Sequence, residues 1–325
     1  MAEPLKILTP FPVFTNDRWS GETAVDITVE TDVSRHADLI GDTDILLSQV
    51  FTAEMAQAAN ALKFIQSSGA GTELIDLSQV PKGCPVAIVH GHEPAIAEWV
   101  IMSMLAINRR LLQADRELRQ GDWTLSYFRK DYDRELSSQT IGILGLGHIG
   151  KEVAARARAF GMRMIGATRT PPSDDAADAL GFDWIVGLDD LDQVLAAADF
   201  VVLALAATPE TQDMIDQSAF AKMKPDASFV NVARASLVSE TALYDALSTR
   251  QIKAAAIDVW WDEPRIVGTV QQVSELPYAD LDNIILSPHL SGLTTGMLER
   301  RFSAIAENID RFARGETPSN IIHWG

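Results

Sequence analysis

The stretch that decides the fold is Thr140–Thr170, TIGILGLGHIGKEVAARARAFGMRMIGATRT. An apolar run leads into three glycines, Gly145, Gly147 and Gly150, and a second apolar run follows at Met162–Ala167. Between a predicted strand and a predicted helix, this G-x-G-x-x-G spacing is typical of a dinucleotide site. The first glycine permits a tight turn, the second lets the backbone approach a pyrophosphate, and the third brings helix against strand. We therefore predict dinucleotide binding here rather than an ordinary glycine-rich turn.

The segment after the glycines has the spacing of an amphipathic helix. We expect the free N–H groups at its start to bind the phosphates of the dinucleotide. The following apolar run completes a strand, turn, helix and strand in sequence. The predicted buried face of the helix consists of Val153, Ala154, Ala157 and Phe160.

Composition limits the partners of this 325-residue chain, whose length suggests two domains. A formal net charge of -18 disfavours nucleic acid or an anionic membrane as a partner, and an anionic substrate would need local Arg or Lys. Cys84 is the only cysteine, so no intrachain disulfide can form, which suits a reducing compartment. The N-terminus does not resemble a signal peptide, and no apolar window is long enough to span a bilayer. We expect a cytoplasmic protein.

The first part of the chain alternates between predicted strands and helical stretches, which indicates a mostly parallel sheet. The expected elements are a helix at Thr52–Leu62 and strands at Leu5–Thr9, Ala24–Glu30, Ile45–Leu47, Phe64–Ser67 and Val86–Val89. The loop Ser67–Gly71 follows the fourth of these strands. Because ligands bind beyond the carboxyl ends of parallel strands, the N–H groups of Ser68 and Gly69 could hold a carboxylate. A loop whose glycines serve only for turning is the alternative.

The run His90–Pro94 contains two histidines and a carboxylate, which are metal-ligand types. The histidines are two residues apart across a glycine and do not share a helix face, and no second Cys or His cluster completes a coordination sphere. We therefore predict no metal site. Pro94 instead starts a helix that crosses between the domains near residue 100, with Arg109 and Arg110 near its later turns. Its expected buried residues are Ala95, Ala97, Val100, Met102 and Leu105.

The rest of the chain completes a second α/β domain. Residues 121–139 break the pattern and are interpreted as an irregular segment and a candidate oligomer arm. After the glycine stretch we expect helices at Leu188–Ala198, Gln217–Lys222 and Glu240–Thr249, and strands at Trp184–Val186, Phe200–Leu205, Ser228–Val232, Ala254–Val259 and Ile284–Leu286. Residues 101–289 then form a doubly wound dinucleotide domain. Residues 1–100 and 290–325, with a final helix at Leu298–Arg314, form a flavodoxin-like substrate domain.

Three motifs follow successive strands of the second domain. They are Asn231-Val232-Ala233-Arg234, Asp258-Val259-x-x-x-Glu263-Pro264 and Ser287-Pro288-His289. With them the sequence resembles the D-isomer-specific 2-hydroxyacid dehydrogenases over almost its whole length. The resemblance implies two Rossmann-like α/β domains with doubly wound parallel sheets and a cleft between them, usually in a homodimer. It implies NAD(P)H-dependent reduction of a 2-oxo acid, with Arg234, Glu263 and His289 as the catalytic residues.

The chemistry of such a reduction suits these residue types. A 2-oxo acid needs an anion clamp, a hydride on one face and a proton at the ketone oxygen. The Arg234 guanidinium can bond the carboxylate and ketone oxygens together. His289 is the one of the three that releases a proton near neutral pH, and a carboxylate at Glu263 favours its charged form. Ser68, Gly69 and His92 are the remaining predicted substrate contacts.

Cofactor binding is assigned to the glycine turn and to the ends of the following strands. The predicted cofactor residues are Gly145, Leu146, Gly147, His148, Ile149, Gly150, Thr168, Arg169, Thr170, Leu205, Ala206, Thr211, Val232, Ala233, Arg234, Asp258 and His289. The run Thr168-Arg169-Thr170 lacks the acid that binds the ribose hydroxyls in NAD sites and offers donors to a 2'-phosphate. We predict preference for NADP(H), with NAD(H) also possible. Asp174 and Asp175 are interpreted as the start of a helix rather than as ribose ligands.

Several alternatives stay open. The substrate is glyoxylate, hydroxypyruvate or a related small 2-oxo acid, or else a bulkier one. His92 and Glu263 stand where formate dehydrogenases of the family carry Asn and Gln, which argues against formate. One of Trp260 and Trp261 is a candidate wall of the substrate pocket, and core packing is the alternative. A nucleotide-sensing protein resembling the corepressors of this family is the rival function, and the acidic composition favours the enzyme.

Overall fold

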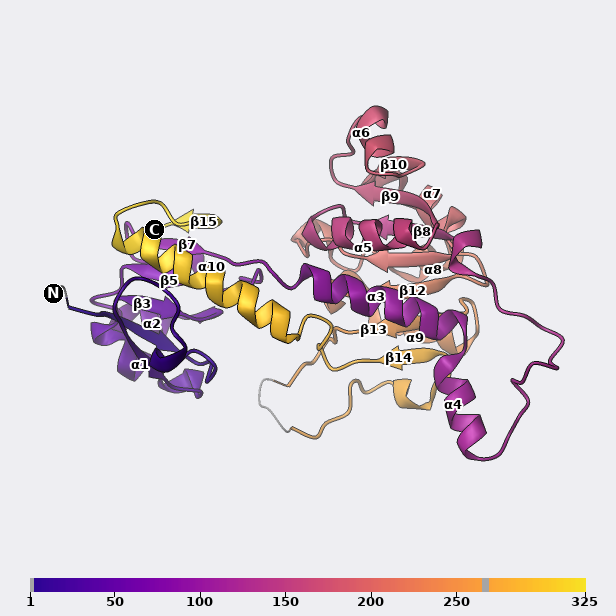
Figure 1. Cartoon of the computed structure of the whole chain (residues 1–325), viewed down its shortest axis with the longest axis horizontal. Coiled ribbons are helices and arrows are strands. Elements are labelled where there is room, and N and C mark those ends of the chain that lie inside the picture. The colour runs from indigo at the N-terminus through magenta and orange to yellow at the C-terminus, as the bar shows by residue number, and fades with distance from the viewer. Residues whose placement is uncertain (1–2, 265–268) are drawn as a thin grey trace. The chain divides into compact units, whose positions relative to one another are not determined.

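The computed structural model describes residues 3–264 and 269–325. The chain divides into two compact units, Met1–His92 with Thr294–Gly325 (unit 1) and Glu93–Leu293 (unit 2). The borders expected from the sequence lay at residues 100 and 290. The difference arises at α3 (Glu93–Asn108), which was expected to cross between the domains. Its buried residues instead share the core of unit 2, and α3 packs along α5 (His148–Ala159), as Figure 1 shows.

Unit 1 is built on a six-stranded sheet in the order β15-β7-β5-β3-β1-β2. Its strands are β1 Leu5–Thr9, β2 Val25–Val29, β3 Ile45–Leu47, β5 Phe64–Gln66, β7 Pro85–Ala87 and β15 Ile321–Trp324. The parallel strands follow the flavodoxin order, with the second strand beside the first and the others on its far side. Strand β15 pairs antiparallel with β7 and was not predicted, because four residues at an edge carry little periodic signal. Two further two-residue strands, β4 Val50–Phe51 and β6 Leu74–Ile75, were missed for the same reason.

Helices and alternating side chains give unit 1 a core on each face of its sheet. Ile7 packs into one core and its neighbour Leu8 into the other, as the two-residue period of a strand requires. The helices are α1 His36–Leu39, α2 Ala53–Ala58 and α10 Thr295–Ala313. Helix α2 ends earlier than predicted, because the backbone leaves the helical region at Ala59. Helix α10 begins earlier than predicted, because Thr294 caps it by accepting a hydrogen bond from Met297 N over 3.1 Å.

Unit 2 contains a seven-stranded, fully parallel sheet in the order β10-β9-β8-β11-β12-β13-β14. Its strands are β8 Thr140–Leu144, β9 Arg163–Thr168, β10 Trp184–Gly187, β11 Phe200–Leu203, β12 Ser228–Asn231, β13 Ala254–Ile257 and β14 Ile284–Leu286. Its other helices are α4 Leu111–Arg119, α6 Asp174–Ala179, α7 Leu191–Ala197, α8 Gln217–Lys222 and α9 Glu240–Ser248. The strand order reverses between β8 and β11, which is the doubly wound arrangement predicted from the glycine stretch.

Two residues predicted to be buried are exposed. Phe160 is 42% exposed, because α5 ends at Ala159 and Phe160 is already the capping residue. Met102 is 55% exposed, because it lies about 200° around α3 from the fully buried Val100. The remaining predicted core positions of the two helices are buried or half-buried.

The segment from residue 120 to residue 135 contains neither helix nor strand, as its composition suggested. It follows α4, which begins after Arg110 adopts the left-handed conformation with φ of 50° and ends the run of α3.

Elsewhere, Cys84 is buried and unpaired, and burial raises the pKa of its thiol to about 12. Within the described part of the chain, no helix combines the length and apolar character needed to cross a membrane.

Candidate active site

The glycine turn of unit 2 is closely packed at two positions and open at the third. Gly145 has φ of 99°, and a Cβ there would lie 2.6 Å from the carbonyl oxygen of Ala204. A Cβ at Gly150 would lie 1.9 Å from the carbonyl oxygen of Gly145, so this position lets α5 begin against the turn. At Gly147 a Cβ would meet nothing within 4 Å. The turn therefore has the form that a bound pyrophosphate requires, with close backbone packing on two sides and space on the third.

Helix α5 begins directly at this turn. Its N-cap, Gly147, makes no side-chain hydrogen bond to the helix. The start of a helix is a place where backbone N–H groups bind anions. His148 is exposed at the first helical position, and Leu146 and Ile149 are half-buried beside it. These residues fit a dinucleotide phosphate bound at the turn.

The carboxyl end of β9 carries the predicted ribose contacts. Thr168 is half-buried, and Arg169 and Thr170 are exposed. Asp174 lies in the first turn of α6, so the helix start predicted there is confirmed. An acid that the sequence analysis did not consider lies nearby, at Glu210. Hydrogen bonds from Thr208 and from its own backbone, with the charge of Arg169, lower the pKa of the Glu210 carboxyl.

Other predicted cofactor residues follow β11 and β12. Leu205 and Ala206 leave the end of β11, and the Thr211 hydroxyl donates to the carbonyl of Ala206 over 3.2 Å. Val232 and Ala233 are buried directly after β12. They follow the carboxyl ends of β11 and β12, on one side of the reversal of strand order. Ligands bind near this reversal in doubly wound sheets.

His289 and Glu263 form a hydrogen-bonded ion pair. The imidazole Nδ1 lies 2.7 Å from Glu263 Oε2, and the other carboxylate oxygen accepts from the N–H of Trp260 over 2.9 Å. The His289 side chain is 51% exposed and that of Glu263 is 33% exposed. Since Nδ1 faces the carboxylate, Nε2 is the nitrogen that can give a proton to another molecule.

The pair shifts both titrations. The hydrogen bond to Glu263 raises the pKa of His289 above its ordinary value, against the opposing effects of burial and the charge of Arg234. Burial alone would raise the pKa of Glu263, but the hydrogen bonds from His289 and Trp260 and the charge of Arg234 lower it. The imidazolium form of His289 therefore persists to higher pH than that of an isolated histidine.

Arg234 completes the charged group at the carboxyl ends of β12, β13 and β14. Its charge acts to lower the pKa of both Glu263 and His289. The backbone around Arg234 is fixed by Asn231, whose side chain donates to the Arg234 carbonyl over 3.2 Å and accepts from Ala233 N over 3.0 Å. The three predicted catalytic residues thus follow three neighbouring strands of one sheet, and the structure shows direct contact between His289 and Glu263.

The backbone around His289 is held by a buried carboxylate that the sequence analysis had assigned to cofactor binding. Asp258 is 1% exposed. Its Oδ1 accepts from Ser287 Oγ over 2.6 Å and from Leu290 N over 2.9 Å, and its Oδ2 accepts from Ser291 N over 3.0 Å. His289 lies between these donors with φ of 53°, a conformation that non-glycine residues rarely adopt.

The two tryptophans pack on the same side of the unit. Trp260 is 8% exposed, and its indole N–H donates to the carbonyl of Ser287 over 2.8 Å. Trp261 stacks on Tyr278 and donates to the carbonyl of Val238 over 3.0 Å. Core packing, the alternative considered for them, therefore describes Trp260 well, and Trp260 also supports the backbone next to His289.

Unit 1 carries the other predicted substrate residues. Ser68 is 7% exposed and Gly69 follows it, with the Gly69 N–H donating to Ser67 Oγ over 3.3 Å. His92 Nδ1 lies 2.9 Å from Nη2 of Arg301, a residue of α10 that the sequence analysis did not select. The pair of arginines at positions 300 and 301 was the sequence signal that could have found it.

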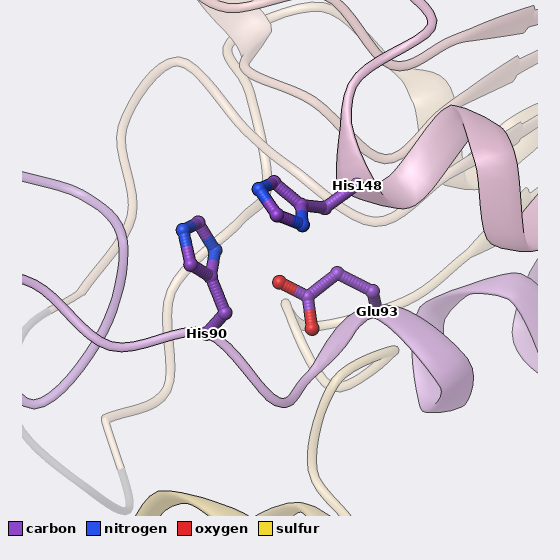
Figure 2. Close-up of side chains that lie close together, drawn as sticks. All are labelled: His90, Glu93 and His148. Atoms are coloured by element: carbon purple, nitrogen blue, oxygen red, sulfur yellow. The ribbon is translucent and has the colours of Figure 1, made fainter. Parts of the chain in front are cut away.

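The predicted absence of a metal was argued from the pairing of His90 with His92. Figure 2 shows that Glu93, at the start of α3, lies beside His148, at the start of α5. The ligand atoms of Glu93 and His148 lie within 4.8 Å of each other. The absence of a metal stays a prediction.

Comparison with known proteins identifies the family. The sequence profile described as "D-isomer specific 2-hydroxyacid dehydrogenase, NAD binding domain" matches residues 101–291. The chain belongs to the D-isomer-specific 2-hydroxyacid dehydrogenase family. The resemblance noted in the sequence is thereby confirmed.

Two curated relatives illustrate the range of the family. The chain is 32% identical over 328 residues to a D-3-phosphoglycerate dehydrogenase of Methanocaldococcus jannaschii, covering 98% of this chain and 59% of that protein. It is 33% identical over 312 residues to a glyoxylate reductase of Thermococcus onnurineus, covering 90% of this chain and 87% of that protein. Both relatives are oxidoreductases by name. Because the match covers 59% of the Methanocaldococcus jannaschii protein, the chain spans less than two thirds of the length of that relative.

Solved structures agree with the two-unit fold. A probable 2-hydroxyacid dehydrogenase of Rhizobium etli, in complex with NADP, HEPES and L(+)-tartaric acid, is 25% identical with a TM-score of 0.77, covering 99% of this chain and 98% of that one. A Polaromonas protein described as a "putative D-isomer specific 2-hydroxyacid dehydrogenase, NAD-binding" is also 25% identical, with a TM-score of 0.81 and coverage of 99% of this chain and 100% of that one. The predicted fold class of α/β domains with doubly wound parallel sheets is confirmed.

Proposed function

We propose that this protein is an enzyme that reduces a small 2-oxo acid to the D-2-hydroxy acid with a nicotinamide cofactor. The observation that carries the proposal is the 2.7 Å pair of His289 and Glu263, with the charge of Arg234 acting on both. A proton donor and an anion clamp at the strand ends of a dinucleotide fold are what this reaction requires. Glyoxylate and hydroxypyruvate are the proposed substrates, and the glyoxylate reductase relative supports the first.

The residues of unit 2 divide the chemistry among them. The bound cofactor supplies a hydride to the ketone carbon. The Arg234 guanidinium bonds a carboxylate oxygen and the ketone oxygen, which fixes the plane of the substrate and stabilises the charge that develops on that oxygen. His289 gives the proton from Nε2 to the ketone oxygen, so that one hydride and one proton convert the ketone to an alcohol. Glu263 keeps His289 protonated and oriented before the transfer.

In this proposal unit 1 contributes to substrate binding. The N–H groups of Ser68 and Gly69 and the side chain of His92 bind the acid group. The long 3.3 Å bond from Gly69 N to Ser67 Oγ supports this role, because a carboxylate is a stronger acceptor than a hydroxyl and would compete well for that N–H.

We propose NADP(H) as the preferred cofactor, with NAD(H) also accepted. The exposed run Thr168-Arg169-Thr170 at the end of β9 offers a guanidinium and two hydroxyls to a 2'-phosphate, and it contains no acid that would repel that group. The Rhizobium etli relative was solved with NADP, which agrees with this proposal. Glu210 acts against it, since its carboxylate interacts with Arg169. A phosphate must compete with that carboxylate for the guanidinium.

We also propose that the protein is a homodimer in which residues 121–139, the candidate arm predicted from the sequence (the arm), cover a second copy. The arm carries four exposed aromatic residues, Trp123, Tyr127, Phe128 and Tyr132, whose exposed fractions are 71%, 87%, 90% and 77%. Exposed aromatic groups in such density are typical of protein interfaces.

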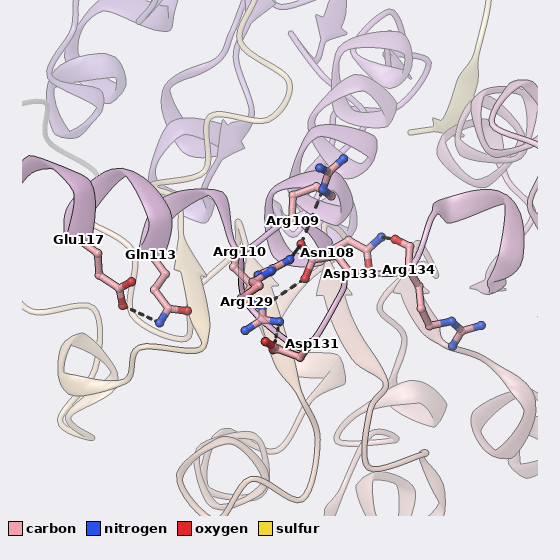
Figure 3. A network of polar contacts seen from close by, with 9 residues as sticks. All are labelled: Asn108, Arg109, Arg110, Gln113, Glu117, Arg129, Asp131, Asp133 and Arg134. Carbon is pink, nitrogen blue, oxygen red and sulfur yellow. Dashed lines mark hydrogen bonds and ion pairs between the residues drawn. The ribbon is translucent and has the colours of Figure 1, made fainter. Parts of the chain in front are cut away.

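Ion pairs at the base of the arm hold it in place. As Figure 3 shows, Arg110 bonds both Asp131 and Asp133, and Arg129 bonds Asp133 over 2.5 Å. A pocket of about 550 Å³ beside this network, lined in part by Ile107 and Leu281, offers room for side chains of a second copy. Sedimentation of the wild-type protein at micromolar concentration tests the homodimer, and a monomer at all concentrations would contradict it.

Turnover of a panel of 2-oxo acids tests the proposed function. Glyoxylate, hydroxypyruvate, 3-phosphohydroxypyruvate and a branched 2-oxo acid should be compared with NADPH and with NADH. We expect oxidation of NADPH with at least one of the small acids. Binding of the cofactor without turnover of any acid would favour the nucleotide-sensing alternative.

A cytoplasmic location remains our proposal, supported by the single cysteine, which is buried as a thiol.

A further inference from the structure

Arg301 projects from α10 onto the two loops of unit 1 that were predicted to contact the substrate. Its backbone N and Cγ lie 3.7 Å from the position of a Cβ built at Gly91. Its guanidinium reaches the Ser67–Gly71 loop, where Nη2 lies 3.5 Å from the position of a Cβ built at Gly69. The same Nη2 lies 2.9 Å from His92 Nδ1. One half-buried cation therefore contacts the ends of both loops.

The contact with Arg301 fixes the tautomer of His92. A guanidinium has only N–H donors and stays protonated at any ordinary pH, so Nδ1 of His92 must be the acceptor. The imidazole is then neutral and carries its proton on Nε2. A second proton on Nδ1 would point at the guanidinium and break the bond. His92 is thereby held as a neutral group whose remaining donor is Nε2–H.

The donors of unit 1 gather at one end of its sheet. Gln49 follows β3, and its amide nitrogen lies 2.8 Å from the Cβ position at Gly69. The Gly69 N–H follows β5, His92 follows β7, and Arg301 reaches the same place from α10. A chain with a net charge of -18 needs a local cation to bind an anionic substrate, and Arg301 is a cation at the predicted carboxylate loop.

We propose that Arg301 is the anion-binding side chain of unit 1 and recognises the carboxylate of the 2-oxo acid together with His92 and Gly69. The inference rests on the proposed function and adds a residue for substrate recognition that the family assignment did not supply. Arg234 aligns the ketone for reduction, and Arg301 provides the affinity that selects an anion. Its loss should therefore weaken substrate binding more than it slows the chemical step.

Steady-state kinetics of Arg301→Ala and Arg301→Gln, beside wild type, test this role. We expect KM for the best substrate of the panel to rise about tenfold or more, which is the usual effect of losing a charge-assisted hydrogen bond. The value of kcat should stay within about threefold, and the dissociation constant of NADPH should not change. Added guanidinium ion should lower KM of Arg301→Ala again, because it can occupy the space left by the side chain.

Arg300→Ala is the matched control. Arg300 precedes Arg301 on α10 and donates to the carbonyl of Gly91 over 2.8 Å, so its loss removes a similar structural contact near the same loop. We expect its KM to stay within about twofold of wild type and not to respond to guanidinium. Equal KM values for the two alanine variants would overturn the proposal, as would a fall in kcat at constant KM.

Calorimetric titration with oxamate, a 2-oxo acid analogue that cannot be reduced, separates this proposal from the proposed function. Oxamate binding that depends on Arg301 in a protein that reduces no 2-oxo acid would support the inference and contradict the proposed function. Turnover with unchanged KM and oxamate affinity in Arg301→Ala would do the reverse. Absence of both turnover and oxamate binding in wild type would contradict both.

Discussion

Replacing Asp258 with Asn exchanges one buried carboxylate oxygen for an NH2 group. The carboxylate of Asp258 holds the loop that carries His289. Asp258 accepts three hydrogen bonds from this loop, two at Oδ1 and one at Oδ2. An Asn side chain can keep the two bonds at Oδ1, from Ser287 and Leu290, but then its NH2 group faces the N–H of Ser291. One bond to a charged acceptor is lost and two donors are left opposed in a site where Ser291 is 5% exposed.

The magnitude follows from these contacts. A hydrogen bond to a charged group contributes about 1.5 to 3 kcal/mol, and an unsatisfied buried N–H costs about 1 to 3 kcal/mol. We therefore expect the variant to lose about 2.5 to 6 kcal/mol in the native arrangement of the loop. The loop can escape this loss by moving, but movement would release the left-handed backbone at His289. Misplacing a proton donor by about 1 Å lowers the rate on the order of 10²-fold.

Three assays distinguish this outcome from a loss of cofactor contact. The value of kcat for the best 2-oxo acid should fall on the order of 10²-fold, the thermal unfolding midpoint should fall, and the NADPH dissociation constant should change little. Ser287→Ala removes only the hydroxyl donor at 2.6 Å and should produce a much smaller change, about 1 kcal/mol. Wild-type kcat and unfolding midpoint in Asp258→Asn would refute the argument. A loss confined to NADPH affinity would instead support the cofactor role first predicted for Asp258.

Three further predictions concern the proposed catalytic and cofactor residues. Arg234→Lys should lower kcat/KM by about tenfold or more although it preserves the charge, because an ammonium cannot reproduce the guanidinium fork that bonds two oxygens. Kinetics near wild type would contradict the role of Arg234 in binding the carboxylate and ketone oxygens. Glu263→Gln should move the alkaline limb of the reduction profile to lower pH, because the carboxylate raises the pKa of His289, and an unmoved limb would refute the pairing. Arg169→Ala should weaken NADPH binding about tenfold or more and leave NADH nearly unaffected, and titrations that show equal losses for both would contradict the 2'-phosphate assignment.

Much of the fold followed from the sequence because local patterns determined it. The glycine stretch and the alternation of apolar runs with helical segments predicted two α/β units with parallel sheets, which the structure confirms. The errors occurred where the determining contact is distant or the signal is short. Strand β15 has only four residues, and its position depends on pairing with β7 across the sheet. Phe160 follows the spacing of the buried face but lies just beyond the last residue of α5.

The residue types of the candidate site were predictable from the sequence, but the residues that hold those site residues in place were less so. Arg234, Glu263 and His289 stand in recognisable motifs after strands, and parallel strands bring their carboxyl ends together. The roles of Asp258 and Arg301 depend on contacts that no local pattern contains. Asp258 bonds residues about 30 positions later, and Arg301 bonds His92 across 209 positions of sequence. Such long-range contacts between loops require coordinates.

The measurement that tests the account most directly is single-turnover oxidation of bound NADPH by a 2-oxo acid in wild type and in His289→Gln. Gln can occupy the site but cannot give a proton as imidazolium does. We predict that the variant binds NADPH as wild type does and that its rate of NADPH oxidation falls on the order of 10²-fold or more. An unchanged rate with glyoxylate or hydroxypyruvate would contradict the assignment of His289 as the proton donor.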